Sequence, residues 1–346
     1  MTIQPTWSRL AQKTEKARSK YLKELRKGIF GPSKFVEYKR LASQERKKAR
    51  KALELPHGPN LSPKDLRKAK KKKKRKARRF MEKRKIDVAR LEKARKRSAE
   101  AIMTATGARL ARNVSDRLPI LASDTSPDTI LGPALDPIVR AVFEPPFEDS
   151  GKWDHVNSVI FTDYTVDSEF LLPNPDTGEI WHQQGFIKED AGDLDTAFVE
   201  SDTGFQIPFQ MPKTGRVDCL VKVTNLEGRH YCVLMDEFGF SDANVVQRTF
   251  IGMRINTGAQ ALETHKVRMF DMVVSGVTDG QWITHYPTPN GPYYVHFRSE
   301  RSYSEDEWLN IGISSDFLHF IYSNDVSIAS EMKFGWRIDQ VCLHVY

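Results

Sequence analysis

The sequence predicts a helical or extended basic N-terminal arm followed by an all-β antiparallel sandwich of the jelly-roll kind. Two observations indicate this division. Residues 1–120 carry 39 basic and 11 acidic side chains, a net charge of +28, whereas residues 121–346 carry 15 basic and 34 acidic ones, a net charge of −19. From about residue 151, short apolar runs separated by turn sequences replace the lysine-rich pattern. Such a charge split between halves is typical of a polyanion-binding arm joined to a separate body.

The arm is expected to span residues 1–114 and to contain three helices. Apolar side chains recur at roughly helical spacing over residues 1–30, and Gly31-Pro32 should end this first helix. A second helix capped by Ser33 should follow, and the sequence around Ser62 should begin a third that runs to about residue 112. The third helix carries few apolar residues, and such helices are seldom stable in isolation. The arm is therefore expected to be either helical or partly disordered.

A proline-containing linker is expected over residues 115–150, because prolines there restrict the chain to extended conformations. The β domain should then occupy residues 151–346. Apolar and polar residues alternate from Arg216 to Val223, as in a strand with one buried face, and regularly spaced short strands favour an antiparallel sandwich. The expected strands are residues 156–164, 205–211, 217–223, 230–235, 246–255, 266–274, 282–286, 293–297, 308–313, 318–322 and 334–346.

The strongest candidate for a functional element is the basic run from Arg67 to Arg79, in which 11 of 13 residues are basic. Such a run predicts contact with the phosphates of nucleic acid, with a steep salt dependence and little sequence preference. Three alternatives remain open: a nuclear-import signal, a tail that binds the ribosome or another acidic surface, and a solubilising tail. The candidate nucleic-acid-binding residues are Arg67, Lys68, Lys70, Lys71, Lys72, Lys73, Lys74, Arg75, Lys76, Arg78 and Arg79.

The β half offers weaker candidates. The proline-rich segment from Tyr286 to Tyr294 contains three tyrosines, Tyr286, Tyr293 and Tyr294. It is either a loop that contacts a sugar or protein partner or a rigid turn with its tyrosines packed down. His230 with Cys232, and Cys342 with His344, are each two residues apart, which on a strand places both side chains of a pair on one face. The two pairs together could form a zinc site, but we expect the cysteines to lie in the core and the histidines at an edge or on the surface.

The sequence contains none of the common nucleotide-binding, serine-hydrolase, zinc-protease or Cys-x-x-Cys motifs. The acidic run 189–195 lacks the spacing of an EF-hand, and acidic pairs such as Asp163 with Asp167 and Asp236 with Glu237 are common by chance among 34 acids. We therefore expect no enzymatic activity, no cofactor and no metal.

Two further properties bear on the setting of the protein. No apolar stretch is long enough for a membrane span or a secretory signal, so no membrane partner is expected. Three cysteines, an odd number, favour a reducing compartment over a disulfide scaffold.

A basic arm, a connector and a C-terminal β domain together resemble the coat proteins of small RNA viruses, on the run Arg67 to Arg79 and the strands after residue 151. The resemblance implies a structural virion protein that contacts packaged nucleic acid and copies of itself or other virion proteins, located in the virion and, during assembly, in the host cytoplasm or nucleus. A tail, portal or capsid-associated phage protein fits nearly as well. The alternative is a lectin-like or protein-binding sandwich anchored in a larger assembly by its arm.

Overall fold

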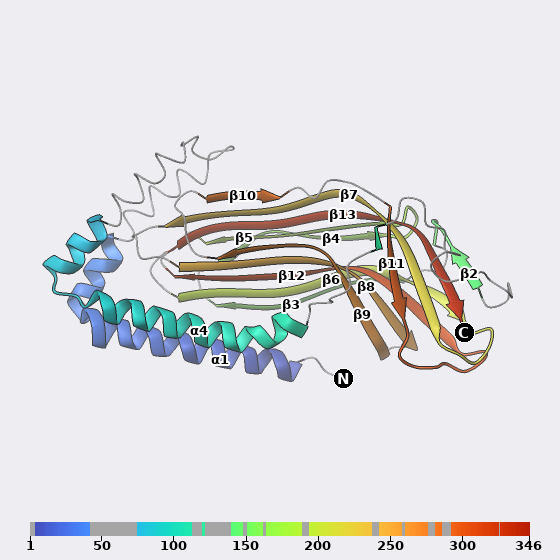
Figure 1. Ribbon diagram of the computed structural model, residues 1–346, viewed down its shortest axis with the longest axis horizontal. Helices are drawn as coiled ribbons and strands as arrows, with labels where there is room; N and C mark the ends of the chain where they lie inside the picture. Colours follow the sequence, from blue (N-terminus) through green and yellow to red (C-terminus); the bar gives the residue numbers. More distant parts are fainter. Residues whose placement is uncertain are drawn as a thin grey trace.

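The computed structural model describes residues 4–41, 75–112, 120–121, 140–147, 151–161, 164–188, 194–236, 242–257, 260–275, 281–285, 292–324 and 326–346. Two antiparallel sheets lie face to face, and the N-terminal helices lie along the outside of one of them (Figure 1). The predicted all-β antiparallel sandwich with a helical N-terminal region is thus confirmed at this level of description.

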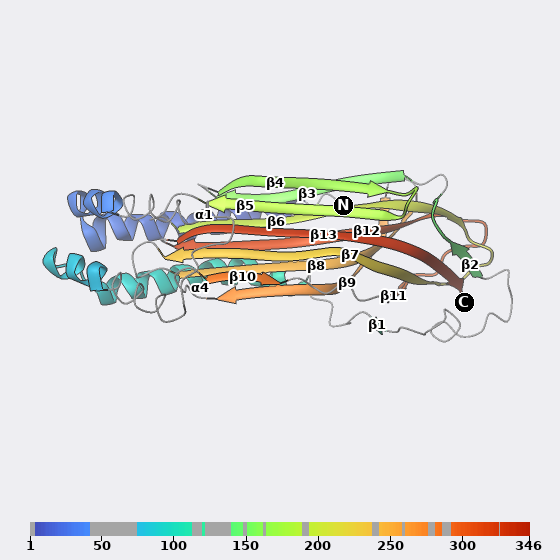
Figure 2. The same cartoon turned by 90° about the horizontal axis from the view of Figure 1, so that it is seen from above.

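The helical part begins with α1 (Gln4–Lys23), which continues into a single π-helical segment, η1 (Glu24–Phe30). Gly31, with φ of 74°, ends η1 at the predicted position, and a short helix over residues 32–41 follows. After residue 75 a second short helix, residues 75–83, leads into α4 (Val88–Arg112), which packs against α1. The helical turns over residues 32–41 and 75–83 project beyond the ends of the strands (Figures 1 and 2). None of the helices in the described ranges is long and apolar enough to cross a membrane.

The prediction of one continuous third helix is wrong, because the chain breaks at Lys85. This residue has a left-handed φ of 51°, and the amide of Ile86 donates to the carbonyl of Met81 as the helix over residues 75–83 ends. Asp87 then caps α4, with its Oδ1 accepting from the amide of Arg90 at 2.9 Å. The break separates the helix over residues 75–83 from α4, and apolar residues of both pieces, such as Met81 and Leu91, join one buried cluster.

Within the described ranges, sheet A contains eight strands, ordered β1-β11-β7-β13-β5-β4, with β10 also paired to β7 and β2 to β13. Its two shortest strands come from the predicted linker, whose apolar ends therefore join this sheet. The strands are β1 (Ile120–Leu121), β2 (Arg140–Phe143), β4 (Tyr164–Asn174), β5 (Glu179–Lys188), β7 (Val217–Asp236), β10 (Gln281–His285), β11 (Tyr293–Arg298) and β13 (Val326–Val345).

Sheet B, as far as the described residues go, contains five strands in the order β3-β6-β12-β8-β9. Away from the helical turns, the strands bend toward the side of sheet B that carries the helices (Figure 1). Bulges in the β8–β9 pairing, one between Thr249 and Phe250, accompany this bend. The strands are β3 (Gly151–Phe161), β6 (Leu194–Gln210), β8 (Asp242–Thr257), β9 (Gln260–Ser275) and β12 (Trp308–Asn324).

Several strands are longer than the sequence predicts. The turn-like sequence Asn225 to Gly228 lies inside β7, where Leu226 is the extra residue of a bulge opposite Gly335 and Trp336. The Asn225 side chain donates to the carbonyl of Glu227 at 3.1 Å, so it satisfies the bulge rather than a turn. The predicted strands 308–313 and 318–322 are likewise one strand, β12. The predicted strands do not include the hairpin of β4 and β5, apart from Tyr164 at its start.

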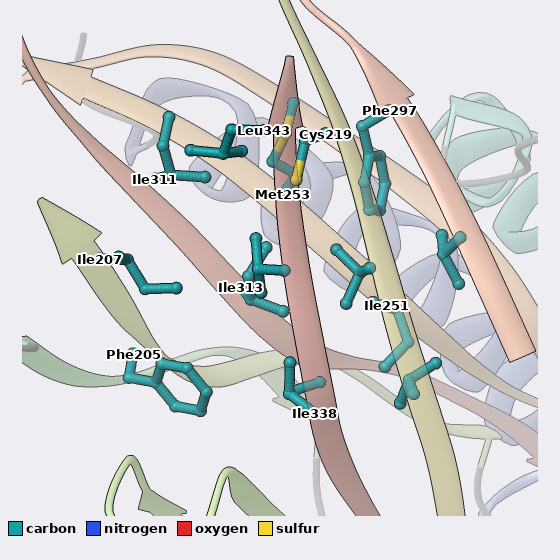
Figure 3. Close-up of a cluster of buried hydrophobic side chains, with 14 of the residues drawn as sticks. Phe205, Ile207, Cys219, Ile251, Met253, Phe297, Ile311, Ile313, Ile338 and Leu343 are labelled. Carbon is teal, nitrogen blue, oxygen red and sulfur yellow. The ribbon is translucent and has the colours of Figure 1, made fainter. Parts of the chain in front are cut away.

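A large apolar core fills the space between the sheets at the end distant from the helical turns (Figure 3). Phe205, Ile311 and Ile313 enter it from sheet B, and Ile338 and Leu343 enter from sheet A, all of them 0% exposed. A second apolar cluster around Phe186 and Leu234 fills the opposite end. The alternating residues of each strand therefore form the two inner faces of a sandwich.

A belt of buried polar side chains separates the two apolar clusters. His319 Nε2 lies 2.7 Å from Ser330 Oγ, and Gln247 bonds His230 and Ser330 at 3.0 and 2.8 Å. Burial lowers the pKa of His319 to about 3, with a further contribution from His230. We call His182, Ser201, His230, Gln247, His319 and Ser330 the polar belt.

The helices are held on the outer face of sheet B by a third apolar cluster. Leu318, Phe320 and Tyr322, at alternate positions of β12, point to this face and pack with Phe198. From the helices come Tyr21, Leu25, Phe30, Phe35, Tyr38, Ala77, Met81, Ile86, Leu91, Ala94 and Ile102, all buried. The sparse apolar residues of the basic helices thus form one coherent contact with the sandwich.

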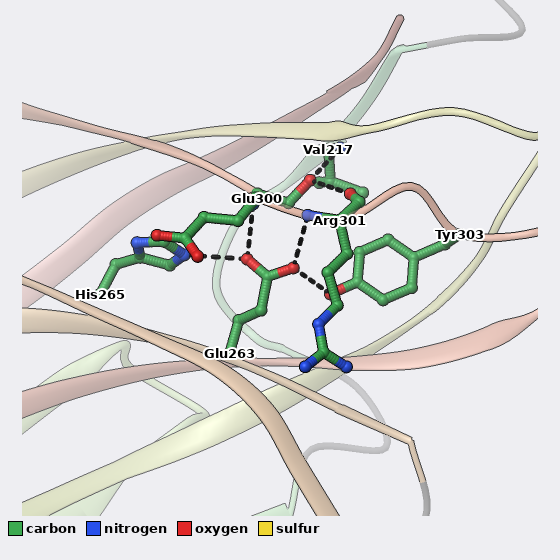
Figure 4. Close-up of polar contacts among 7 residues, drawn as sticks. Val217, Glu263, His265, Glu300, Arg301 and Tyr303 are labelled. Carbon is green, nitrogen blue, oxygen red and sulfur yellow. Dashed lines mark hydrogen bonds and ion pairs between the residues drawn. The ribbon is translucent and has the colours of Figure 1, made fainter.

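The connection from β11 to β12 is fixed by the carboxylate of Glu263 on β9 (Figure 4). It accepts hydrogen bonds from the amides of Glu300 and Arg301 at 2.7 and 2.9 Å, from Tyr303 Oη at 2.9 Å and from His265 Nε2 at 3.0 Å. Burial raises the pKa of Glu263, but these hydrogen bonds outweigh it and lower the pKa overall. This anchor sets the position at which β12 begins, at Trp308.

Candidate functional site

The outer face of sheet B changes character beyond the helices. Every second residue of β12 points away from the core, toward this outer face. At Leu318 the helices cover these side chains, and from Asp316 back to Trp308 they form a row of mostly polar or small residues. We call this region the polar face; it lies on the inner side of the bend in the sheet (Figure 1). Its members are Trp153 (β3), Asp202, Gly204 and Gln206 (β6), Gly252 and Arg254 (β8), Lys266 (β9), and Trp308, Asn310, Gly312, Ser314 and Asp316 (β12).

Four charged side chains interlock at the centre of the polar face. Asp202 and Asp316 are direct cross-strand neighbours on β6 and β12. Arg254 Nη2 lies 2.6 Å from Asp202 Oδ1, and Lys266 Nζ lies 2.7 Å from Asp316 Oδ2. Each carboxylate therefore has one cation of its own, as neighbouring like charges require in a buried setting.

The pKa values of the two carboxyl groups are shifted in opposite directions. Burial, followed by the charge of Asp316, raises the pKa of Asp202 against the effect of Arg254. Burial acts on Asp316 in the same sense, but Lys266 and Arg254 outweigh it and hold its pKa below the ordinary value. The two cations thus favour the ionised form of Asp316, although this residue is only 1% exposed.

Trp153 is oriented by the same cluster. Its Nε1 donates to Asp202 Oδ1 at 2.7 Å, and the Arg254 guanidinium lies 5.3 Å from its ring centroid. A Cβ added at Gly312 would lie 2.8 Å from Trp153 Cη2, so the indole rests on a position that only glycine leaves open. Gly204 and Gly252 flank Ser314 in the next row, which keeps the floor of the polar face low.

Trp308 is the most exposed residue of the polar face, at 62%. It lies four residues before Gly312 on β12, which is about 13 Å along a strand. Gln206 and Asn310, both partly exposed, add amide groups between the two tryptophans. The arrangement offers two aromatic surfaces, amide groups and fixed charges on one side of a sheet, which suits binding of a ligand with both apolar and hydroxyl-bearing surfaces.

The structure describes only part of the predicted nucleic-acid site. Arg75, Lys76, Arg78 and Arg79 are exposed on the helix over residues 75–83. The remaining members, Arg67, Lys68, Lys70, Lys71, Lys72, Lys73 and Lys74, lie outside the described residues.

Two of the three tyrosines of the predicted aromatic loop lie in the described residues, and neither is exposed. Tyr293 and Tyr294 lie on β11 and are 5% and 8% exposed. Tyr293 packs edge-on against Phe270, and burial raises its pKa, while Tyr294 packs with Leu220 and Cys342. This is the packed-down alternative, because both faces of β11 are covered here. Tyr286 lies outside the described residues.

The two His/Cys pairs lie far apart. Cys232 and His230 point between the sheets, whereas Cys342 packs on the other face of sheet A. Cys232 pairs in register with Ser330 and Leu220 with Cys342, so twelve residues of β13, about 40 Å, separate them. The chain within the described ranges contains no group of His, Cys, Asp or Glu that could hold a metal ion. The acidic run 189–193, Asp163 and Glu237 lie outside those ranges.

Sequence analysis did not find the polar face. The sequence signal that could have indicated it is the presence of small residues inside predicted strands, namely Gly252 and Gly312, and of Ser314 directly after one. Glycine within a strand often marks a position where another group approaches the backbone closely. The pairing of Asp202 with Asp316 depends on the register of strands more than 100 residues apart in the chain.

No family model matches the sequence, and no curated protein matches it. Among solved structures, similarity is found to TmCBM61 in complex with β-1,4-galactotriose, with 9% identity and a TM-score of 0.15 over 53% of this chain and 88% of that one. The family 11 carbohydrate-binding module of a Clostridium thermocellum cellulosomal cellulase gives 11% identity and a TM-score of 0.16 over 60% and 95% of the chains. A CBM4 structure gives 12% identity and a TM-score of 0.14 over 48% of this chain and 77% of that one. Scores this low establish no common ligand.

Proposed function

We propose that this chain is a β-sandwich binding module that holds an oligosaccharide on the polar face. The observation that carries the proposal is the pair of tryptophans, Trp153 and Trp308, on one side of sheet B with polar groups between them. A sugar ring has an apolar C–H face that packs on an indole and hydroxyl edges that bond to amide and guanidinium groups.

The charged cluster supports this role by fixing the site before the ligand arrives. Trp153 is held by Asp202, Arg254 and Gly312, so its indole loses little freedom on binding. The two positive and two negative charges of the cluster compensate one another, which favours a neutral ligand over a strongly charged one.

We further propose that the module acts without catalysis. Glycoside hydrolysis needs a carboxylic acid and a second carboxylate on either side of the scissile bond. Asp316 is 1% exposed and paired with Lys266, and Asp202 is 7% exposed and bound by Trp153 and Arg254. Both acids thus serve the framework of the site rather than the surface that a ligand would touch.

We infer that the sandwich is a jelly roll. In chain order β5, β6, β7 and β8 alternate between sheets A and B, and β9, β11, β12 and β13 follow in sheets B, A, B and A. The resulting rows, β11-β7-β13-β5 and β9-β8-β12-β6, form the two four-stranded layers of such a fold, which lectin domains and viral coats share. Fold alone therefore does not separate the two functions.

The virion role expected from the sequence has no support in the fold comparisons, and the three solved structures named above are carbohydrate-binding modules. The lectin-like alternative is the one that the polar face favours. Residues 67–79 remain candidates for binding nucleic acid.

The test is affinity electrophoresis of the full chain through gels that contain different soluble polysaccharides, followed by calorimetry with oligosaccharides of the best one. We expect retardation by at least one neutral polysaccharide. Trp308→Ala should weaken its binding about tenfold, because an exposed stacking surface is lost while the fold is untouched.

Phe170→Ala is the matched control, since Phe170 on β4 is an aromatic residue 46% exposed on sheet A. It should bind as the wild type does. No retardation by any polysaccharide, or equal affinity of Trp308→Ala and wild type, would overturn the proposal.

A further inference from the structure

The helices carry a regular stripe of lysines. Lys13, Lys16, Lys20, Lys23 and Lys27 follow one another at intervals of three and four residues along α1 and η1, which places them on one side of the helix. All five are exposed. No acidic side chain within the described ranges pairs with any of them. We call these five residues the lysine stripe, and it extends about 21 Å.

Several arginines of the N-terminal helical part, by contrast, are engaged within the protein. Arg97 Nη2 lies 2.8 Å from Glu24 Oε1, Arg84 Nε donates to Glu37 at 2.8 Å, and Arg18 pairs with Glu15. The stripe is therefore not balanced by the acids that the helices do possess. Over residues 4–41 and 75–112 the chain has 25 basic and 7 acidic side chains.

A small pocket opens beside the stripe, between α1 and α4. It has a volume of about 80 Å³ and is lined by Ala17, Lys20, Tyr21, Glu24, Ala94, Arg97, Ser98 and Ala101. Ser98 is 6% exposed, and its hydroxyl has no hydrogen-bond partner among the residues that the structure describes. A buried hydroxyl without a partner is costly, so an acceptor from outside the chain would satisfy it.

We propose that the lysine stripe and this pocket bind the phosphodiester backbone of nucleic acid. One phosphate oxygen accepts hydrogen bonds from Ser98 Oγ and the Lys20 ammonium, and neighbouring phosphates lie along the other stripe lysines. The site is separate from the polar face and from residues 67–79.

A repeating polyanion fits this surface better than a folded acidic protein does. Protein interfaces combine charge with buried apolar and aromatic groups. The one exposed large apolar side chain described in the helices, Val36, lies on the helix over residues 32–41, outside the stripe. Lysine ammonium groups act as point charges, which suits contact with phosphates regardless of sequence.

The experiment measures binding of the full chain to a short mixed-sequence DNA duplex by fluorescence anisotropy over a series of salt concentrations. In K13Q/K20Q/K27Q the slope of log K against log salt should become shallower by about 2 to 3, because three phosphate contacts are lost. The control K83Q/K152Q/K213Q removes the same charge from exposed positions outside the stripe. It should change the slope by less than about 1.

Ser98→Ala tests the pocket itself, and alanine preserves the helix. It should weaken duplex binding about threefold at fixed salt and leave the slope unchanged, whereas Ser98→Thr should retain binding. Equal losses in the stripe variant and its control, or no binding by the wild type at low salt, would overturn the proposal. So would a stripe variant that binds DNA normally but loses binding to polyglutamate, since the surface would then serve an acidic protein.

Discussion

Asp316 illustrates how single residues hold the polar face together. Its carboxylate is almost fully buried and yet stays ionised, because Lys266 lies 2.7 Å away and Arg254 is close enough to lower its pKa further. Removing one partner from such a pair leaves a buried charge without compensation, which costs more than the pair itself contributes.

Lys266→Met should therefore lower the free energy of unfolding by about 3 kcal/mol at neutral pH. The substitution keeps the aliphatic stem, so the loss reports the ammonium group. Urea denaturation followed by tryptophan fluorescence measures the effect.

The double variant Lys266→Met/Asp316→Asn is the companion experiment. It removes both charges and should recover a large part of the lost stability, because the buried amide carries no charge. If the single variant were as stable as the wild type, the ion pair would not hold this face together.

At the scale of elements, the helical layer depends on the outer face of sheet B. The helices carry a large excess of positive charge and few apolar residues, and those residues meet Phe198, Leu318, Phe320 and Tyr322. Helices that are polar over most of their surface gain stability from such a face rather than from their own propensity.

Phe320→Ala should destabilise the chain by about 3 to 5 kcal/mol, because a side chain that is 0% exposed is removed from the contact with the helices. The helical layer should also become accessible to trypsin earlier than the sandwich does. Limited proteolysis alongside thermal unfolding measures both effects.

Val36→Ala is the control, since Val36 is 68% exposed on the helix over residues 32–41. It should change stability by less than about 0.5 kcal/mol. Unchanged proteolysis in Phe320→Ala would mean that the helices are held elsewhere.

At the scale of the molecule, the polar belt makes the whole sandwich sensitive to acid. Burial lowers the pKa of His182 to about 3, against the effects of Asp316 and the Ser315 backbone, and it lowers that of His319 to about 3 with help from His230. Both histidines are neutral in the folded protein, whereas in the unfolded chain they take up protons near pH 6.5.

Stability should therefore be complete above pH 6.5 and fall as the pH is lowered toward 3, because only the unfolded state gains protons in this range. The slope is about 1.4 kcal/mol per pH unit for each histidine. Two histidines thus cost up to about 4 kcal/mol between pH 6.5 and 5. Urea denaturation at a series of pH values measures this slope.

His319→Gln should roughly halve the slope, since glutamine can still bond to Ser330 without titrating. His155→Gln, at an exposed position on β3, should leave it unchanged. A stability that is flat between pH 6.5 and 5 would show that these histidines do not control the acid response.

The order of elements was readable from the sequence in several places. Gly31 ends the first helical segment, and the alternation from Arg216 to Val223 indicates a strand whose inner residues, such as Cys219 and Val221, are buried. These signals are local, because chain conformation and side-chain alternation act over a few residues. The turn indicated around Asn225 is a bulge inside β7, and the third helix, predicted to be continuous, breaks at Lys85, so both local interpretations were wrong.

The sequence by itself determined that a lysine-rich helical part precedes an acidic sandwich, since charge and strand period are properties of composition and spacing. Only the tertiary structure decided that the helices lie on sheet B, that Tyr293 and Tyr294 are packed away, and that Asp202 meets Asp316 beside Trp153. These facts follow from strand register and from the burial of faces, which join residues that are distant in the chain.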